Sequence, residues 1–123
     1  ELLLNIAHEL GHQSLINLQK VDKIIMDSHF SPIYSVIRKT NRPSILSFHA
    51  LTASVFMLEF ILRNYDFLKS ICSEEYFFER IENIKNDIQK GISSFSKVNF
   101  SPLGTQIINE YIALSLESSK YEI

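Results

Sequence analysis

The sequence predicts an all-α fold, a small single-domain bundle of four to five helices. Apolar residues recur three and four positions apart along most of the chain, which is the period of one helical face. No segment shows the strict alternation typical of a half-buried strand, and three glycines and three prolines are too few for a turn-rich sandwich or barrel. With 123 residues, of which 46% are hydrophobic, the chain has the material for one compact core.

The first helix is expected from the start of the chain to about Met26, because apolar and small residues recur there at helical spacing. The residues on this face are Leu3, Ile6, Ala7, Leu10, Ser14, Leu18 and Val21. Residues 28–43 then read as a structured loop, because Pro32, Asn41 and Pro43 interrupt the helical pattern.

A second helix is expected to begin at Pro43, whose missing N–H has no intrahelical partner in a first turn, and to end near Asn64. Its stripe is Leu46, Ala50, Ala53, Met57, Phe60 and Ile61. Ser73 is the predicted N-cap of a third helix of about 20 residues, whose apolar residues recur every three or four positions. Ser101 and Pro102 open the last helix as N-cap and first-turn proline.

Composition and charge exclude several classes of partner. The formal net charge of −2 and the pI of about 6.1 give no basic surplus for a phosphate backbone, so we expect no nucleic-acid binding. The longest apolar segment, residues 50–62, is interrupted by Thr52, Ser54 and Glu59, so we expect no membrane span. The single cysteine, Cys72, cannot form an internal disulfide. These features together favour a cytoplasmic protein.

The run His8-Glu9-Leu10-Gly11-His12 is an H-E-x-x-H motif inside a helical pattern. Residues four apart lie one turn apart on the same face, so both imidazoles can reach one metal ion while Glu9 points beside it. The alternative is two ordinary surface histidines.

A metal held by two histidines needs a third protein ligand, and the second helix offers His49 and Glu59. His49 lies 37 residues beyond His12 (49 − 12) and near the start of that helix. Glu59 lies about 80° around the helix from His49 and can pair with Arg63 one turn on. We therefore favour His49, although a histidine on an apolar helix can also be a satisfied core residue.

The loop before the second helix contains the basic cluster Arg38, Lys39 and Arg42. A guanidinium binds a carboxylate through two parallel hydrogen bonds, so Arg38 and Arg42 are candidates for holding an acidic cosubstrate near a metal. On their chemistry alone, they could equally be solvated loop cations.

The motif and its downstream sequence together resemble the HExxH-type peptide β-hydroxylases, which are iron(II)- and α-ketoglutarate-dependent enzymes that modify ribosomally made peptides. The resemblance covers about Ile6 to Ile112. It is carried by His8-Glu9-x-x-His12, Leu15, Leu18, Tyr34, Arg38, Arg42-Pro43, Phe48-His49-Ala50, Ala53 and Ser101-Pro102-Leu103-Gly104.

This resemblance implies a set of roles for the residues of the motif. His8, His12 and His49 would bind Fe(II), with Zn as the alternative metal, and Arg38 or Arg42 would contact α-ketoglutarate. The partner would be a peptide, such as a ribosomal precursor peptide. Residues 1–123 would form a single helical metal-binding domain, the C-terminal part of a longer family architecture.

Three functions remain open at this point. In a hydroxylase, Glu9 would handle protons beside the metal. In an HExxH zinc metallopeptidase, Glu9 would be the general base that activates a metal-bound water. The third reading is a catalytically inactive helical module that binds a partner.

Overall fold

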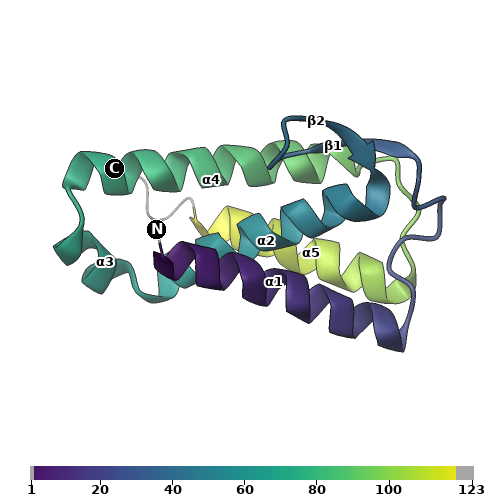
Figure 1. Cartoon of the computed structure of the whole chain (residues 1–123), viewed down its shortest axis with the longest axis horizontal. Helices are drawn as coiled ribbons and strands as arrows, with labels where there is room; N and C mark the ends of the chain where they lie inside the picture. Colours follow the sequence, from purple (N-terminus) through teal and green to yellow (C-terminus); the bar gives the residue numbers. More distant parts are fainter. Residues whose placement is uncertain (1, 119–123) are drawn as a thin grey trace.

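The computed structural model describes residues 2–118, apart from the side chain of Val21, and confirms the predicted all-α fold. Within these residues, five helices and one two-stranded hairpin follow one another along the chain (Figure 1). The elements are α1 (Leu2–Val21), β1 (Pro32–Ser35), β2 (Thr40–Pro43), α2 (Ser44–Arg63), α3 (Tyr65–Ile71), α4 (Glu74–Ser94) and α5 (Pro102–Ser118).

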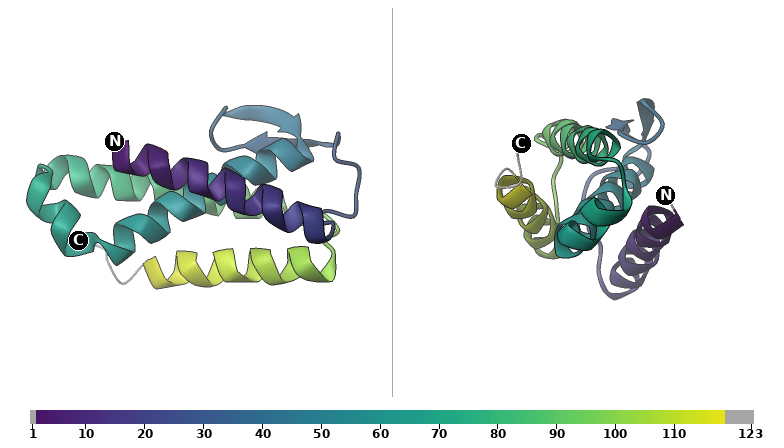
Figure 2. Two further views of the ribbon diagram at one scale, coloured as in Figure 1. Left: turned by 60° about the horizontal axis from the view of Figure 1, so that its bottom comes forward. Right: turned by 90° about the vertical axis from the view of Figure 1, so that its left-hand side faces the viewer.

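Helix α2 is the central element, and α1, α4, α5 and the hairpin pack around it (Figure 2). A helix with neighbours on several sides must be apolar on several sides. This explains why α2, of the helices that the structure describes, is long and apolar enough to cross a membrane by length and composition alone. Most of the apolar part of α2 is buried inside the protein, and the expected absence of a membrane span stays a prediction.

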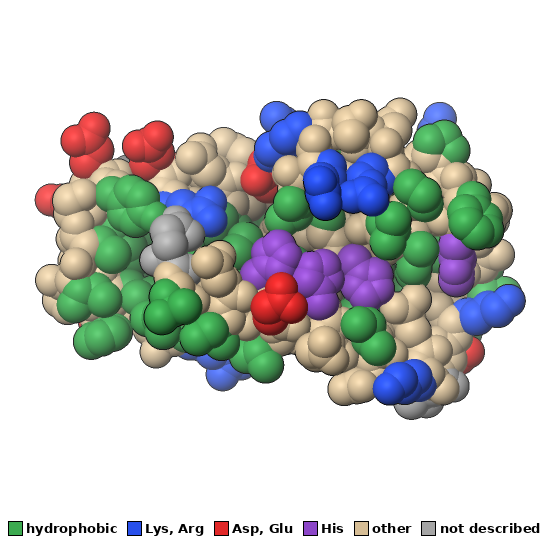
Figure 3. Space-filling model, viewed as in Figure 1, with side chains coloured by type: hydrophobic (Ala, Val, Ile, Leu, Met, Phe, Trp, Pro, Cys, Tyr) green, Lys and Arg blue, Asp and Glu red, His purple; other side chains and the backbone are tan. Residues whose placement is uncertain are grey.

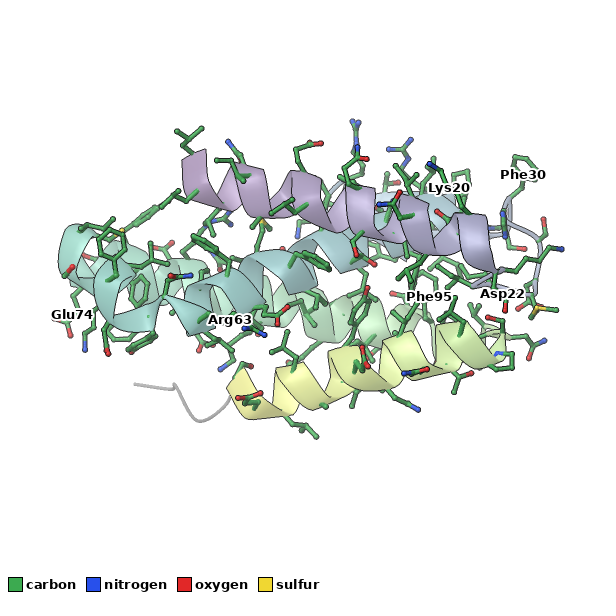
Figure 4. The ribbon with its side chains drawn as sticks, turned by 90° about the horizontal axis from the view of Figure 1, so that it is seen from below. Lys20, Asp22, Phe30, Arg63, Glu74 and Phe95 are labelled. Carbon is green, nitrogen blue, oxygen red and sulfur yellow. The ribbon has the colours of Figure 1, made fainter. Side chains whose placement is uncertain are left out.

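The core is centred on Phe48, whose side chain is fully buried in the first half of α2. Its ring packs edge-on against Phe95 and also contacts Phe100 and Tyr111. Phe95 lies at the end of α4, between the helices in the view from below (Figure 4). Phe48, which directly precedes His49 on α2, is thus held in an aromatic cluster.

Helix α1 differs from the prediction in its end and in its buried face. It ends at Val21 and not at Met26, because the next residues run antiparallel to the segment before α5: Met26 donates to the Asn99 carbonyl (2.8 Å) and Ser101 donates to the Ile24 carbonyl (2.9 Å). The expected face is also rotated: Leu4, Ala7, Gly11 and Leu15 are buried, whereas Leu3, Ile6 and Leu10 are exposed.

The segment expected to be a loop contains a β-hairpin. Strands β1 and β2 pair antiparallel, with Ile33 opposite Arg42 and Ser35 opposite Thr40. Lys39 adopts a positive φ of 58° in the turn between them. The hairpin is fastened to α2 by Ser47, which donates to the Ile33 carbonyl (2.6 Å).

The two predicted N-caps are confirmed. The Ser73 hydroxyl accepts from the Tyr76 N–H at the start of α4 (3.3 Å), and the Ser101 hydroxyl accepts from the Gly104 N–H at the start of α5 (3.0 Å). Each cap satisfies one of the backbone donors that a helix leaves free at its first turn.

Candidate functional site

Three histidines from two helices meet on one face of the molecule. His8 and His12 lie one turn apart on α1, and His49 lies in the first half of α2. His8 Nε2 is 2.9 Å from His12 Nε2, and His12 Nδ1 is 3.3 Å from His49 Nδ1. Figure 3 shows histidine side chains in a row across this face, with basic side chains beside them on one edge and an acidic side chain on the other. The structure therefore brings the three predicted histidines, His8, His12 and His49, side by side.

A glycine inside the motif allows α1 to come this close to α2. A Cβ atom on Gly11 would lie 3.1 Å from the Ala53 Cα atom and 3.2 Å from Phe56 Cγ, which is tighter than most packed contacts. Ala53 is one turn beyond His49 on α2, and Gly11 is next to His12 on α1. The close crossing of the two helices at Gly11 thus brings the imidazoles of His12 and His49 into contact.

The donor set suits a transition metal in type, and two of the three histidine pairs have a suitable nitrogen–nitrogen distance. Imidazole nitrogens are ligands for zinc and iron, and two ligands each ~2.1 Å from a metal lie about 3.0–3.4 Å apart. The arrangement is nevertheless a chain, because His12 faces His8 with one nitrogen and His49 with the other. Among residues 2–118, no group of three His, Cys, Asp or Glu side chains surrounds a point where a metal could sit. Metal binding would therefore require the rings to rotate.

The environment favours the neutral form of His8 and His49, and a neutral imidazole is the form that binds metals. Partial burial and the neighbouring His12 lower the pKa of His49. The same two causes lower the pKa of His8, and the carboxylate of Glu9 opposes them in part.

Both predicted arginines border the histidines. A pocket of about 350 Å³ is lined by His8, His12, His49, Arg38 and Arg42. The hairpin supplies Arg42 from β2 and Arg38 from its turn. Lys39, the third cation of the cluster, points elsewhere and pairs with Asp87 on α4 (2.6 Å). The two arginines of the hairpin thus line the pocket, whereas the lysine links the hairpin to α4.

The two candidate carboxylates lie outside this pocket. Glu9 is exposed and lines a separate, shallow hollow with Asn5, Ile6 and Leu10. Glu59 accepts two hydrogen bonds from the Arg63 guanidinium (2.8 and 3.1 Å). It borders a groove between α2 and α5. Of the two candidates for a third ligand, only His49 is near His8 and His12.

Sequence reasoning missed Gln19 and the apolar mouth of the pocket. The Gln19 side chain lies 3.0 Å from His49 Nε2. Its position seven residues after His12, about two helical turns, could have signalled that it shares the histidine face. The apolar mouth is formed by Ile16, Ile37 and Leu46, which are 38%, 41% and 42% exposed. Only the hairpin brings Ile37 there.

Comparison of the chain with protein-family models, with curated proteins and with solved structures finds no match.

Proposed function

We propose that the chain is the metal-binding domain of a non-haem Fe(II)- and α-ketoglutarate-dependent enzyme that hydroxylates a peptide side chain. The observation that carries the proposal is that three histidines and two arginines line one pocket. This combination joins ligands for iron with a cationic site for a carboxylate cosubstrate.

The chain's own residues have distinct roles in this proposal. His8, His12 and His49 would hold the metal, and three protein ligands leave positions open for cosubstrate and oxygen. Arg38 and Arg42 would bind the distal carboxylate of α-ketoglutarate and so orient it in the pocket. Iron and α-ketoglutarate together supply an oxidation by O₂ that releases CO₂ and succinate and leaves a hydroxyl group on the substrate. Glu9, beside His8 but outside the pocket, would handle protons at its edge.

The apolar mouth of the pocket supports a peptide as the substrate. Ile16, Ile37 and Leu46 present apolar surface next to charged and polar groups. A peptide can cover such a mouth with its side chains while one residue reaches the histidines. A ribosomally made precursor peptide is the partner class that we propose.

A zinc peptidase is the main competitor, and the positions of the carboxylates argue against it. Its general base must reach a water bound to the metal. Glu9 lies outside the pocket, and Glu59 is paired with Arg63. Within the described residues, neither carboxylate lines the pocket that the three histidines share.

Metal analysis with matched variants tests the proposal. The protein is loaded with Fe(II) under nitrogen, and bound iron is measured by elemental analysis with and without α-ketoglutarate. We expect one iron per chain, loss of iron binding in His49→Ala, and normal binding in Glu59→Ala. Succinate release that requires Fe(II), α-ketoglutarate and O₂ would support hydroxylation. Iron binding that depends on Glu59 in place of His49, or peptide hydrolysis with zinc, would refute the proposal.

A further inference from the structure

A continuous line of hydrogen-bond contacts runs from Gln19 through the three histidines. Gln19 Oε1 is 3.0 Å from His49 Nε2, His49 Nδ1 is 3.3 Å from His12 Nδ1, and His12 Nε2 is 2.9 Å from His8 Nε2. We infer that Gln19 is a positioning residue that fixes which nitrogen of His49 carries the proton. It thereby fixes which side chain donates and which accepts in every hydrogen bond of the line.

The donors and acceptors along the line determine where each proton lies. A neutral imidazole has one N–H donor and one bare acceptor nitrogen, and an amide oxygen can only accept. His49 therefore donates from Nε2 to Gln19, which leaves His49 Nδ1 bare to accept from His12 Nδ1. His12 Nε2 is then bare and accepts from Nε2 of His8. Each of the three contacts then has one donor and one acceptor.

The histidines alone do not determine which ring donates and which accepts in each contact. If His49 carried its proton on Nδ1, both imidazole contacts would simply reverse and remain equally good. Within residues 2–118, His8 Nδ1 at the far end has no hydrogen-bond partner that would decide between the two directions. Gln19 is the member of the line that is not an imidazole, and its oxygen faces His49. A lost hydrogen bond at a partly buried group costs ~1 kcal/mol, which is enough to favour one tautomer several-fold.

The consequence for the site is that His49 presents a bare nitrogen, Nδ1, toward the other histidines. A metal ligand must offer such a bare nitrogen, and a hydrogen bond from the opposite ring nitrogen fixes the ring and its tautomer. The inference deepens the proposed function at this point, because Gln19 would orient the third ligand. The tautomer itself requires only the contacts among the four side chains.

Nitrogen NMR of the metal-free protein tests the inference directly. Protonated and bare ring nitrogens give distinct ¹⁵N shifts, so the tautomer of His49 can be measured at pH 8, above the ordinary histidine pKa of ~6.5. We expect the Nε2–H form in the parent protein. Gln19→Glu keeps an oxygen acceptor and should keep that form, whereas Gln19→Met removes the acceptor at similar volume and should give a mixture of tautomers. Gln13→Met, an exposed position on the same helix, is the matched control and should leave His49 unchanged.

A second measurement separates this inference from the proposed function. Zn(II) alone is titrated into the parent protein and the variants, and Gln19→Met should weaken binding by about 10- to 100-fold, as partners of metal ligands typically do. If the parent protein binds no Zn(II) or Fe(II), the proposed function fails while the NMR result still judges Gln19. An Nδ1–H tautomer of His49 in the parent, or an unchanged tautomer in a folded Gln19→Met variant, would overturn the inference.

Discussion

Arg38 and Arg42 carry the two guanidinium groups of the pocket, and no carboxylate within residues 2–118 pairs with either of them. Their charge is therefore available to a ligand. Replacing either with Gln should weaken α-ketoglutarate binding by about 10- to 100-fold, because a hydrogen bond to a charged group contributes ~1.5–3 kcal/mol. Calorimetric titration of the metal-loaded protein measures this effect.

Lys39→Gln is the matched control for the arginines, because Lys39 lies in the same hairpin, has the same charge and pairs with Asp87 outside the pocket. It should leave the affinity for α-ketoglutarate nearly unchanged. Equal losses of α-ketoglutarate affinity in all three variants would mean that binding depends only on the net charge of the hairpin and not on a specific site.

The lowered pKa values of His8 and His49 predict a pH-dependent stability. Burial and the neighbouring His12 disfavour the charged form of both imidazoles in the folded protein. The unfolded chain takes up protons at the ordinary histidine pKa of ~6.5, and the folded chain does so only at lower pH. As the pH falls below about 6.5, the unfolded state therefore binds more protons, and the free energy of unfolding decreases. The decrease ends once the pH is below the folded pKa values.

Urea unfolding of the metal-free protein at several pH values between 5 and 8 measures this slope. The double variant His8→Gln, His49→Gln should have a smaller slope than the parent. His29→Gln provides the control, because His29 lies outside the pocket and contacts the Ile25 carbonyl. A parent slope that survives the double substitution would show that other groups cause it.

At the scale of the secondary-structure elements, the close approach of α1 to α2 at Gly11 determines how near His12 lies to His49. Gly11→Ala improves the intrinsic helix propensity by ~1 kcal/mol, but it places a methyl group against the Ala53 backbone, and overpacking typically costs about 1–3 kcal/mol. The two effects partly cancel, so stability should fall by at most ~2 kcal/mol. The separation of the helices should increase, and metal affinity should fall by more than stability does.

Gln13→Ala is the control for this substitution, because the same helix gains propensity at an exposed position without any crowding. It should raise the melting temperature slightly and leave metal affinity unchanged. Parental metal affinity in Gly11→Ala would show that the close crossing is not needed for the site.

The four long helices and the two serine caps could be predicted from the sequence because their causes are local, whereas the short helix α3 was not predicted. Ser73 and Ser101 cap helices whose first turns follow directly. The hairpin could not be predicted in this way, because its strands have four residues each and pair Pro32 with Pro43, so they lack the usual alternation. Its position depends on a tertiary contact, the hydrogen bond from Ser47 to Ile33.

The site shows the same division between local and tertiary causes. The proximity of His8 and His12 follows from helical spacing alone. The contact between His12 and His49 depends on the crossing at Gly11, and spacing in the sequence does not reveal it. The buried face of α1 was predicted incorrectly for a related reason: Ile6 and Leu10 fit the period, but only packing decides which of two apolar stripes is covered.

At the scale of the whole molecule, α1 is a long helix that packs against a single neighbour. Among the described elements, only α2 packs closely along it, and α4 and α5 lie beyond α2 (Figures 2 and 4). A helix that packs on one side opens locally more easily than helices that pack on several sides, as α2 and α4 do. The amide hydrogens of α1 should therefore exchange faster than those of α2 and α4 in the metal-free protein, as measured by hydrogen exchange with mass spectrometry.

Metal binding should slow exchange in α1 more than in α4, because a ligand that binds only the docked state stabilises it. Equal exchange rates in α1 and α2 would instead indicate that the two helices open only with the whole domain.

Because α1 packs only against α2 among the described elements, the chain could be divided into two fragments after α1. A backbone cut just after α1 would yield a short peptide bearing His8, His12 and Gln19, and a larger fragment bearing His49 and both arginines. Neither fragment holds all three imidazoles, so the complete set would exist only after complementation. In such a split protein, recovered metal binding would report directly that α1 has docked against α2.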